Sequence, residues 1–204
     1  PLQLAESARY LSAVLQSPLP LELLGLRLGA PSAFSRLDLT CADLLELGRL
    51  LVQRYPDRSQ PILFLGLRTA GTYFSMLLHA FLMTEGYRRT AALTVQPKKG
   101  ASRRERRELA RYAEEDFTLV IVDDPPNSGS AIVLAVDIAC QAGFDLGRTR
   151  VLVPTHPTSP DWASALPDGQ VITLEPKRWR KKQLLESGNV EQRLTEYFSL
   201  QGFS

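Results

Sequence analysis

Two adjacent carboxylates stand in the stretch TLVIVDDPPNSGSAI, residues 118–132. The apolar residues before them predict a strand at 118–123 that is buried on both faces. Because side chains alternate along a strand, Asp123 and Asp124 cannot both point into the core, where an unpaired carboxylate would be costly. Two acids at this position can accept hydrogen bonds from a pair of vicinal hydroxyls or help to hold a magnesium ion.

A cluster of small polar residues follows the acids and opens a predicted helix at 130–142. Such small side chains leave several backbone N–H groups free to converge on an anion, and the dipole of a helix is positive at its N-terminus. A diol site beside a phosphate site describes a ribose phosphate. The alternative is that Asp124 caps the turn and Ser128 caps the helix. The candidate phosphate loop consists of Asn127, Ser128, Gly129, Ser130 and Ala131.

The elements that must position these residues alternate along the chain. Short apolar runs predict buried strands, and leucines three and four residues apart predict helices. This alternation is typical of a parallel sheet with helices on both faces, an α/β doubly wound fold. Ligands of such a sheet bind outside the carboxyl ends of its strands, so the loops at that edge are the candidates for binding. The further predicted strands are 62–67, 91–96, 150–154 and 170–174, and the further helices are 40–55, 72–85 and one or two near the C-terminus.

The motif LVIVDDPPNSGSAI resembles the phosphoribosyl pyrophosphate (PRPP) binding motif of the type I phosphoribosyltransferases. That motif has several apolar residues, two acids, two usually apolar positions and a phosphate loop of small residues, and its orotate phosphoribosyltransferase form is the most similar. The resemblance implies the type I phosphoribosyltransferase fold with a small hood formed by the N-terminal segment, the C-terminal segment or both. It also implies that Asp123 and Asp124 engage the ribose hydroxyls while Asn127 to Ala131 wrap the 5′-phosphate.

The loop after strand 62–67 reads Arg68-Thr69-Ala70-Gly71 and would correspond to the pyrophosphate loop of the family. Gly71 permits close approach of the backbone, and Arg68 offers a planar fork of donors to phosphate oxygens. A nucleoside-triphosphate P-loop has the glycine spacing of Gly66 and Gly71, but its lysine is missing here. A surface salt bridge is the alternative role for Arg68.

The loop PKKGAS, residues 97–102, would correspond to the mobile loop that closes over the substrate in orotate-type enzymes. Lys98 and Lys99 could neutralise a departing pyrophosphate, and closure would exclude water from a reactive ribosyl cation. Ser102 and Glu105 predict a capping box for the next helix. That helix mixes both charges, so we expect a solvated face; its arginines could contact nucleic acid, but no binding motif supports this role. They are Arg103, Arg104, Arg106 and Arg107.

The chain departs from the family pattern within the motif. Pro125 and Pro126 replace the usual aliphatic pair, which stiffens the loop and removes two backbone donors. Asn127 stands where purine-salvage members often have an acid, so hypoxanthine and guanine are disfavoured and orotate-like bases remain open. Outside the motif, His79 is expected in or near the core, whereas His156 follows a strand at the ligand-bearing edge and could contact the base or the pyrophosphate.

Composition argues against several classes of protein. The 24 Lys and Arg against 22 Asp and Glu leave a formal charge of +2, too small to imply nucleic acid or an anionic membrane as a partner. No apolar run approaches the roughly 20 residues of a spanning helix, so we expect a cytoplasmic protein. Cys41 and Cys140 lack metal-ligand spacing and are expected as small buried residues. Trp162, and Trp179 within the basic run 177–182, suggest a partner or chain-continuation surface; a solvated basic helix and a phosphate patch are the alternatives for this run.

Three parts are expected along the chain: an N-terminal appendage or hood at 1–37, a phosphoribosyltransferase core at 38–155, and a C-terminal hood strand with helices at 156–204. Because type I members are commonly dimers, the resemblance implies a possible homodimer. The start at Pro1 equally allows a module of a larger chain.

The expected reaction is displacement of magnesium-bound pyrophosphate from PRPP by a nitrogen of a base, or the reverse. Arg68, Lys98 and Lys99 are the catalytic candidates, and Asp123 and Asp124 would hold Mg²⁺ directly or indirectly. Because the same site can serve catalysis or control, the alternative is a non-catalytic module that binds PRPP or a nucleotide and regulates a larger protein.

Overall fold

The computed structural model describes residues 39–155 and 169–184, together with 191–192, 195–196 and 199. The chain divides into two compact units, Pro1–Ala30 and Pro31–Ser204, and all described residues belong to the second. The predicted appendage at 1–37, His156 and Trp162 therefore lie outside the described residues.

A five-stranded sheet, parallel throughout, forms the centre of this unit, in the order β2-β1-β3-β4-β5. The α/β doubly wound architecture is confirmed, and each predicted strand is found within one residue of its expected ends. The strands are β1 Ile62–Leu67, β2 Thr90–Val95, β3 Thr118–Val122, β4 Thr149–Pro154 and β5 Val171–Leu174. The helices are α4 Cys41–Arg54, α5 Ala70–Thr84, α6 Arg103–Glu114, α7 Ser130–Gln141 and α8 Arg180–Leu184, with short 3₁₀ turns η1 Pro97–Lys99, η2 Leu146–Arg148 and η4 Pro176–Arg178.

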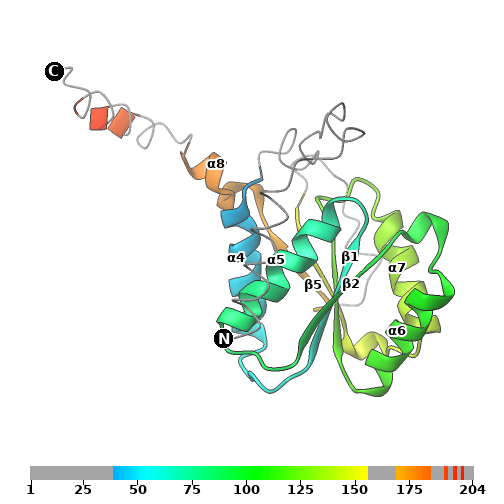
Figure 1. Cartoon of the computed structure of the whole chain (residues 1–204). Coiled ribbons are helices and arrows are strands. Elements are labelled where there is room, and N and C mark those ends of the chain that lie inside the picture. The colour runs from blue at the N-terminus through cyan, green and yellow to red at the C-terminus, as the bar shows by residue number, and fades with distance from the viewer. Residues whose placement is uncertain (1–38, 156–168, 185–190, 193–194, 197–198, 200–204) are drawn as a thin grey trace, which may run out of the picture. The chain divides into compact units, whose positions relative to one another are not determined.

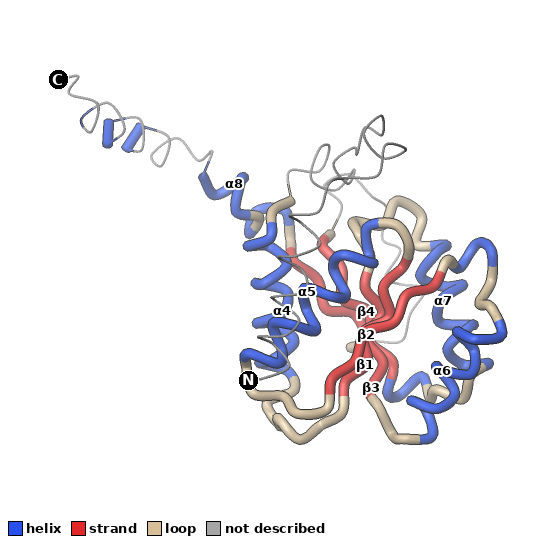
Figure 2. Tube along the Cα trace, viewed as in Figure 1, coloured by secondary structure: helices blue, strands red, loops and turns tan. Residues whose placement is uncertain are grey.

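Helices cover both faces of the sheet: α4 and α5 lie on one face, and α6 and α7 lie on the other (Figures 1 and 2). Successive strand residues alternate between these layers. In β1, Ile62 and Phe64 pack under α4 and α5, while Leu63 and Leu65 pack under α6 and α7. A strand covered on both faces needs residues without polar side chains at every position, which explains the unbroken run ILFLGL.

The connections from β1 and β3 leave in opposite directions. Strand β1 leads through α5 to the edge strand β2, whereas β3 leads through α7 to β4 on the other side. Since β1 and β3 are neighbours, their carboxyl ends flank the point where the winding of the sheet reverses. Open α/β sheets bind ligands in the crevice at this point.

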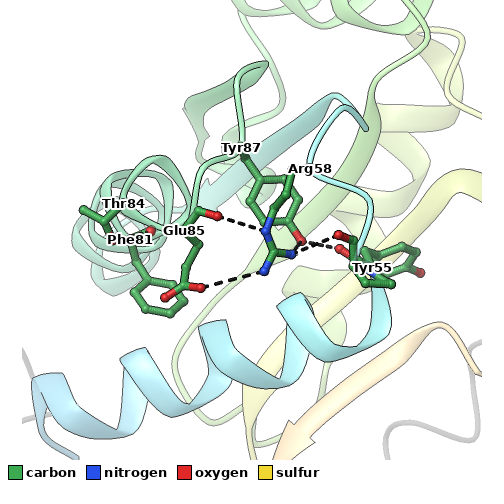
Figure 3. Close-up of polar contacts among 7 residues, drawn as sticks. Tyr55, Arg58, Phe81, Thr84, Glu85 and Tyr87 are labelled. Atoms are coloured by element: carbon green, nitrogen blue, oxygen red, sulfur yellow. Dashed lines mark hydrogen bonds and ion pairs between the residues drawn. The ribbon is translucent and has the colours of Figure 1, made fainter.

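At the amino edge of the sheet, where the strands begin, a network of hydrogen bonds surrounds Arg58 (Figure 3). Arg58 donates to the carbonyl of Glu85 and to the hydroxyl of Tyr87, each at 2.9 Å, and its guanidinium lies 3.8 Å from the Glu85 carboxylate. The Tyr87 hydroxyl donates to the carbonyl of Tyr55, whose own hydroxyl accepts from Arg150. The network joins the segments that enter β1, β2 and β4.

Several sequence-based expectations need correction. Trp179 is not part of a surface: it is 1% exposed, and its Nε1 donates to the carbonyl of Leu174 at 3.2 Å. Cys41 and Cys140 are free thiols but exposed, because they lie on outward faces of amphipathic helices. His79 is partly buried, as expected, and its Nδ1 has no hydrogen-bond partner in the described structure; burial lowers its pKa.

Strand β5 was expected within a C-terminal hood, and it pairs in parallel with β4 as the edge strand of the main sheet. None of the described helices is long and apolar enough to cross a membrane.

Candidate functional site

The loops that follow β1 and β3 lie against each other at the carboxyl edge. Gly66 of β1 pairs with Val122 of β3, and a methyl group on Gly71 would lie only 2.4 Å from the Val122 carbonyl oxygen. A methyl group on Gly66 would lie 2.1 Å from the carbonyl oxygen of Gly71. Both glycines are thus needed for close packing, and two of the three predicted ligand loops are brought together.

Two of the described helices that begin at this edge, α4 and α6, have capping boxes. The Asp43 carboxylate accepts from the Thr40 N–H at 2.6 Å before α4, and the Glu105 carboxylate accepts from the Ser102 N–H at 2.7 Å before α6. The capping box predicted for Ser102 and Glu105 is confirmed. These helix ends have partners for their N–H groups within the chain.

The helices α5 and α7, which follow the two adjacent loops, begin without a side-chain cap. The residue before α7 is Gly129, with φ at +68°, and the Ser128 hydroxyl accepts a long hydrogen bond, 3.4 Å, from the N–H of Ser130, the first residue of α7. In the described part of the chain, the N–H groups of Ala70, Gly71 and Ser128 have no acceptor. Free N–H groups at two neighbouring helix starts can bind an anion.

Asp123 and Asp124 directly follow β3 and precede the turn that leads into α7. Burial raises the pKa of both carboxyls, and the neighbouring Asp124 carboxylate raises that of Asp123 further, to about 8. The Asp124 N–H donates to the Asp123 carboxylate at 3.0 Å, but neither acid has a cationic partner among the described residues. Such a pair can accept hydroxyl donors or a cation brought by a ligand.

The remaining phosphate-loop residues form a compact, partly exposed turn. Pro125 and Pro126 are buried, whereas Asn127, Ser128 and Ser130 are exposed. The hydroxyls of Ser128 and Ser130 lie 3.1 Å apart, and the Ser130 N–H points to the Ser128 hydroxyl at 3.4 Å. The buried prolines anchor the turn, so its polar groups and the backbone up to Ala131 remain available to a ligand.

The carboxylates fit Mg²⁺ only as part of a shared site. No group of three or more His, Cys, Asp or Glu side chains that could hold a metal occurs among the described residues. Magnesium in nucleotide enzymes is usually held by one or two carboxylates together with substrate phosphates. Asp123 and Asp124 match that pattern.

Arg68, in the first loop, has a partner. Its side chain donates to the carbonyl of Thr94 at 3.1 Å and forms an ion pair with Glu105. The peptide bond between Arg68 and Thr69 is cis. The surface salt bridge, the alternative role for Arg68, is present. Its partner, Glu105, could not be identified from sequence because it lies on α6, in a distant part of the chain.

The second loop is a short turn. Lys98 and Lys99 are exposed on η1, whose Pro97 is buried, and η1 packs against α7. The lysines therefore lie on the side of the sheet that carries the phosphate loop, but no contact joins them to Asp123 or Asp124.

No model of a known protein family matches this chain, and no curated protein matches its sequence.

Proposed function

We propose that the chain is a phosphoribosyltransferase, which transfers ribose 5-phosphate between PRPP and a nitrogenous base. The observation that carries this proposal is the arrangement at the β1/β3 switch point. There, two helices begin without a side-chain cap on the residue before them, next to two acids that have no cationic partner among the described residues. Phosphate, diol and pyrophosphate groups of one ligand would satisfy all of these groups.

Each part of the site would act on a different part of the ligand. The turn from Asn127 to Ala131 would bind the 5′-phosphate, the ribose hydroxyls would donate to Asp123 and Asp124, and the backbone of the loop from Thr69 to Gly71 would bind pyrophosphate. Mg²⁺, held by the two acids and the pyrophosphate, would supply positive charge to the leaving group. Positioning and charge stabilisation are the protein's main contributions to such a reaction.

In the reaction, the bond between C1 of the ribose and a pyrophosphate oxygen breaks, and a bond from C1 to a nitrogen of the base forms. Lys98 and Lys99 would neutralise the departing pyrophosphate after moving toward it. Asn127 cannot take a proton from the base, so bases that need little help with deprotonation, such as orotate, are the first candidates.

A second candidate function is a module that binds PRPP or a nucleotide without turning it over. The ion pair of Arg68 with Glu105 and the anchoring of the phosphate loop by two buried prolines favour this alternative, because both restrict the loops.

The test of the site is calorimetric titration with PRPP, with and without Mg²⁺, on the wild type and on the variant Asp123→Asn/Asp124→Asn. We expect magnesium-dependent binding by the wild type and at least a 100-fold loss in the variant. Unchanged binding by the variant would remove these acids from the site. Substitution of Lys98 and Lys99 by Ala then separates the two functions: an enzyme loses rate of pyrophosphate release, whereas a binding module retains its affinity.

A further inference from the structure

Arg68 is held on the side of β1 that faces away from the two acids. Its Nη2 donates both to the carbonyl of Thr94, at 3.1 Å, and to the carboxylate of Glu105. Thr94 belongs to β2, whereas Asp123 and Asp124 follow β3, and β1 lies between these two strands. The guanidinium therefore does not face the crevice between β1 and β3 in this state.

One carboxylate, that of Glu105, connects two ligand loops. Its Oε2 accepts from the Ser102 N–H at 2.7 Å and thereby caps α6, while its Oε1 accepts from Arg68. The side chains of Arg68 and Glu105 are 42% and 22% exposed, so the pair is accessible to solvent and to a charged ligand. An anion that binds Nη2 of Arg68 must compete with Glu105 for it.

We propose that Glu105 is a positioning residue that competes with the pyrophosphate group of the ligand for Arg68. This inference rests on the proposed function. A pyrophosphate group carries enough charge and enough oxygens to displace the Glu105 carboxylate from Arg68. A ligand that has only a 5′-phosphate lacks this group, so the ion pair of Arg68 with Glu105 would stay in place. Glu105 thus makes the site discriminate between PRPP and a nucleoside monophosphate.

The test compares Glu105→Gln with Glu108→Gln, which removes the same charge one turn further along α6. Glutamine also serves in a capping box, so the first variant keeps the cap while it loses the ion pair. Glu108 contacts Arg111, at 3.1 Å, and is not bonded to Arg68. In calorimetric titrations at low salt with inorganic pyrophosphate and Mg²⁺, we expect Glu105→Gln to bind about 2- to 5-fold more tightly than wild type. We expect no change for Glu108→Gln.

A double-mutant cycle distinguishes this role from a general structural one. In an Arg68→Ala background the gain from Glu105→Gln should vanish, because the two side chains act on the same ligand group. The gain should also shrink at high salt, where the ion pair is screened. A gain that persists without Arg68, or that Glu108→Gln reproduces, would overturn the proposal.

The same titrations tell whether the role of Glu105 is wrong or the proposed function as a whole is wrong. If wild type binds pyrophosphate and Glu105→Gln binds equally or more weakly, Glu105 does not compete, and the proposed function stands. If neither protein binds pyrophosphate or PRPP, both proposals fail.

Discussion

The amino and carboxyl edges of the sheet differ in whether their charged side chains have partners. At the amino edge, Arg58 is paired with Glu85 and Tyr87 (Figure 3), and Arg150 donates to the hydroxyl of Tyr55. At the carboxyl edge, two partly buried acids have no cationic partner in the described chain, and two helices begin uncapped. The amino edge has the organisation of a structural support. The carboxyl edge retains polar groups without a partner among the described residues, and perturbed acids of this kind are typical of functional sites.

The largest expected effect is on the pH dependence of stability, and it comes from Asp123. The Asp123 carboxyl has a pKa of about 8 in the folded chain and about 4 in the unfolded chain, so the folded state holds its proton more tightly. The stability from this proton is fully present below about pH 4 and is lost as the pH rises through about 8. Relative to Asp123→Asn, the wild type should lose on the order of 5 kcal/mol across this window, about 1.4 kcal/mol for each pH unit. Urea denaturation at several pH values measures the difference, and parallel profiles for the two proteins would show that Asp123 ionises freely.

The next largest effect tests the contact between the two loops. Gly71→Ala places a methyl group 2.4 Å from the carbonyl oxygen of Val122, which must move. We expect about 2–3 kcal/mol of destabilisation by overpacking, together with weakened PRPP binding. Thermal denaturation and calorimetry measure both. Gly86→Ala is the control for a glycine with free space around it, although its φ of +89° adds backbone strain of about 1 kcal/mol. Normal binding by Gly71→Ala would mean that the ligand does not depend on this contact.

Substitution at the amino edge should lower the free energy of unfolding and leave PRPP binding unchanged. Arg58→Ala removes the donors to Glu85 and Tyr87, and we expect a loss of about 2 kcal/mol with unchanged affinity for PRPP. Arg49→Ala is the matched control, because Arg49 forms only an exposed ion pair with Glu46. Urea denaturation of both variants checks this. If Arg58→Ala weakened PRPP binding as strongly as the aspartate variants, the proposed separation between the edges would be wrong.

The smallest expected effect compares a capped helix with an uncapped one. Ser102→Ala should cost about 1 kcal/mol, because the Ser102 hydroxyl accepts from the Glu105 N–H at 3.2 Å. Ser128→Ala should cost less in the free protein, since the Ser128 hydroxyl accepts a longer hydrogen bond, 3.4 Å, from the Ser130 N–H. Melting temperatures of the two variants measure the difference. An equal loss in both would show that Ser128 stabilises α7 in solution.

Much of the fold and part of the site could be predicted from sequence. The apolar runs located all five strands, and the spacing of Ser102 and Glu105 located the start of α6, because these signals act over a few residues. The burial of Trp179 could not be predicted, since its neighbours Arg178 and Arg180 are basic and its burial depends on packing in the core beneath α4 and α5. The partner of Arg68 was missed for the same reason: Glu105 is 37 residues away.

By itself, the sequence determined the strands, the alternation that leads to a doubly wound sheet, and the two acids followed by a small-residue turn. These features follow from side-chain chemistry and local backbone preference. Tertiary structure decided the strand order, the contact of Gly71 with Val122, the burial that raises the pKa of Asp123, and the side of β1 on which Arg68 lies. Each of these depends on packing between segments distant in the chain, which local sequence does not encode.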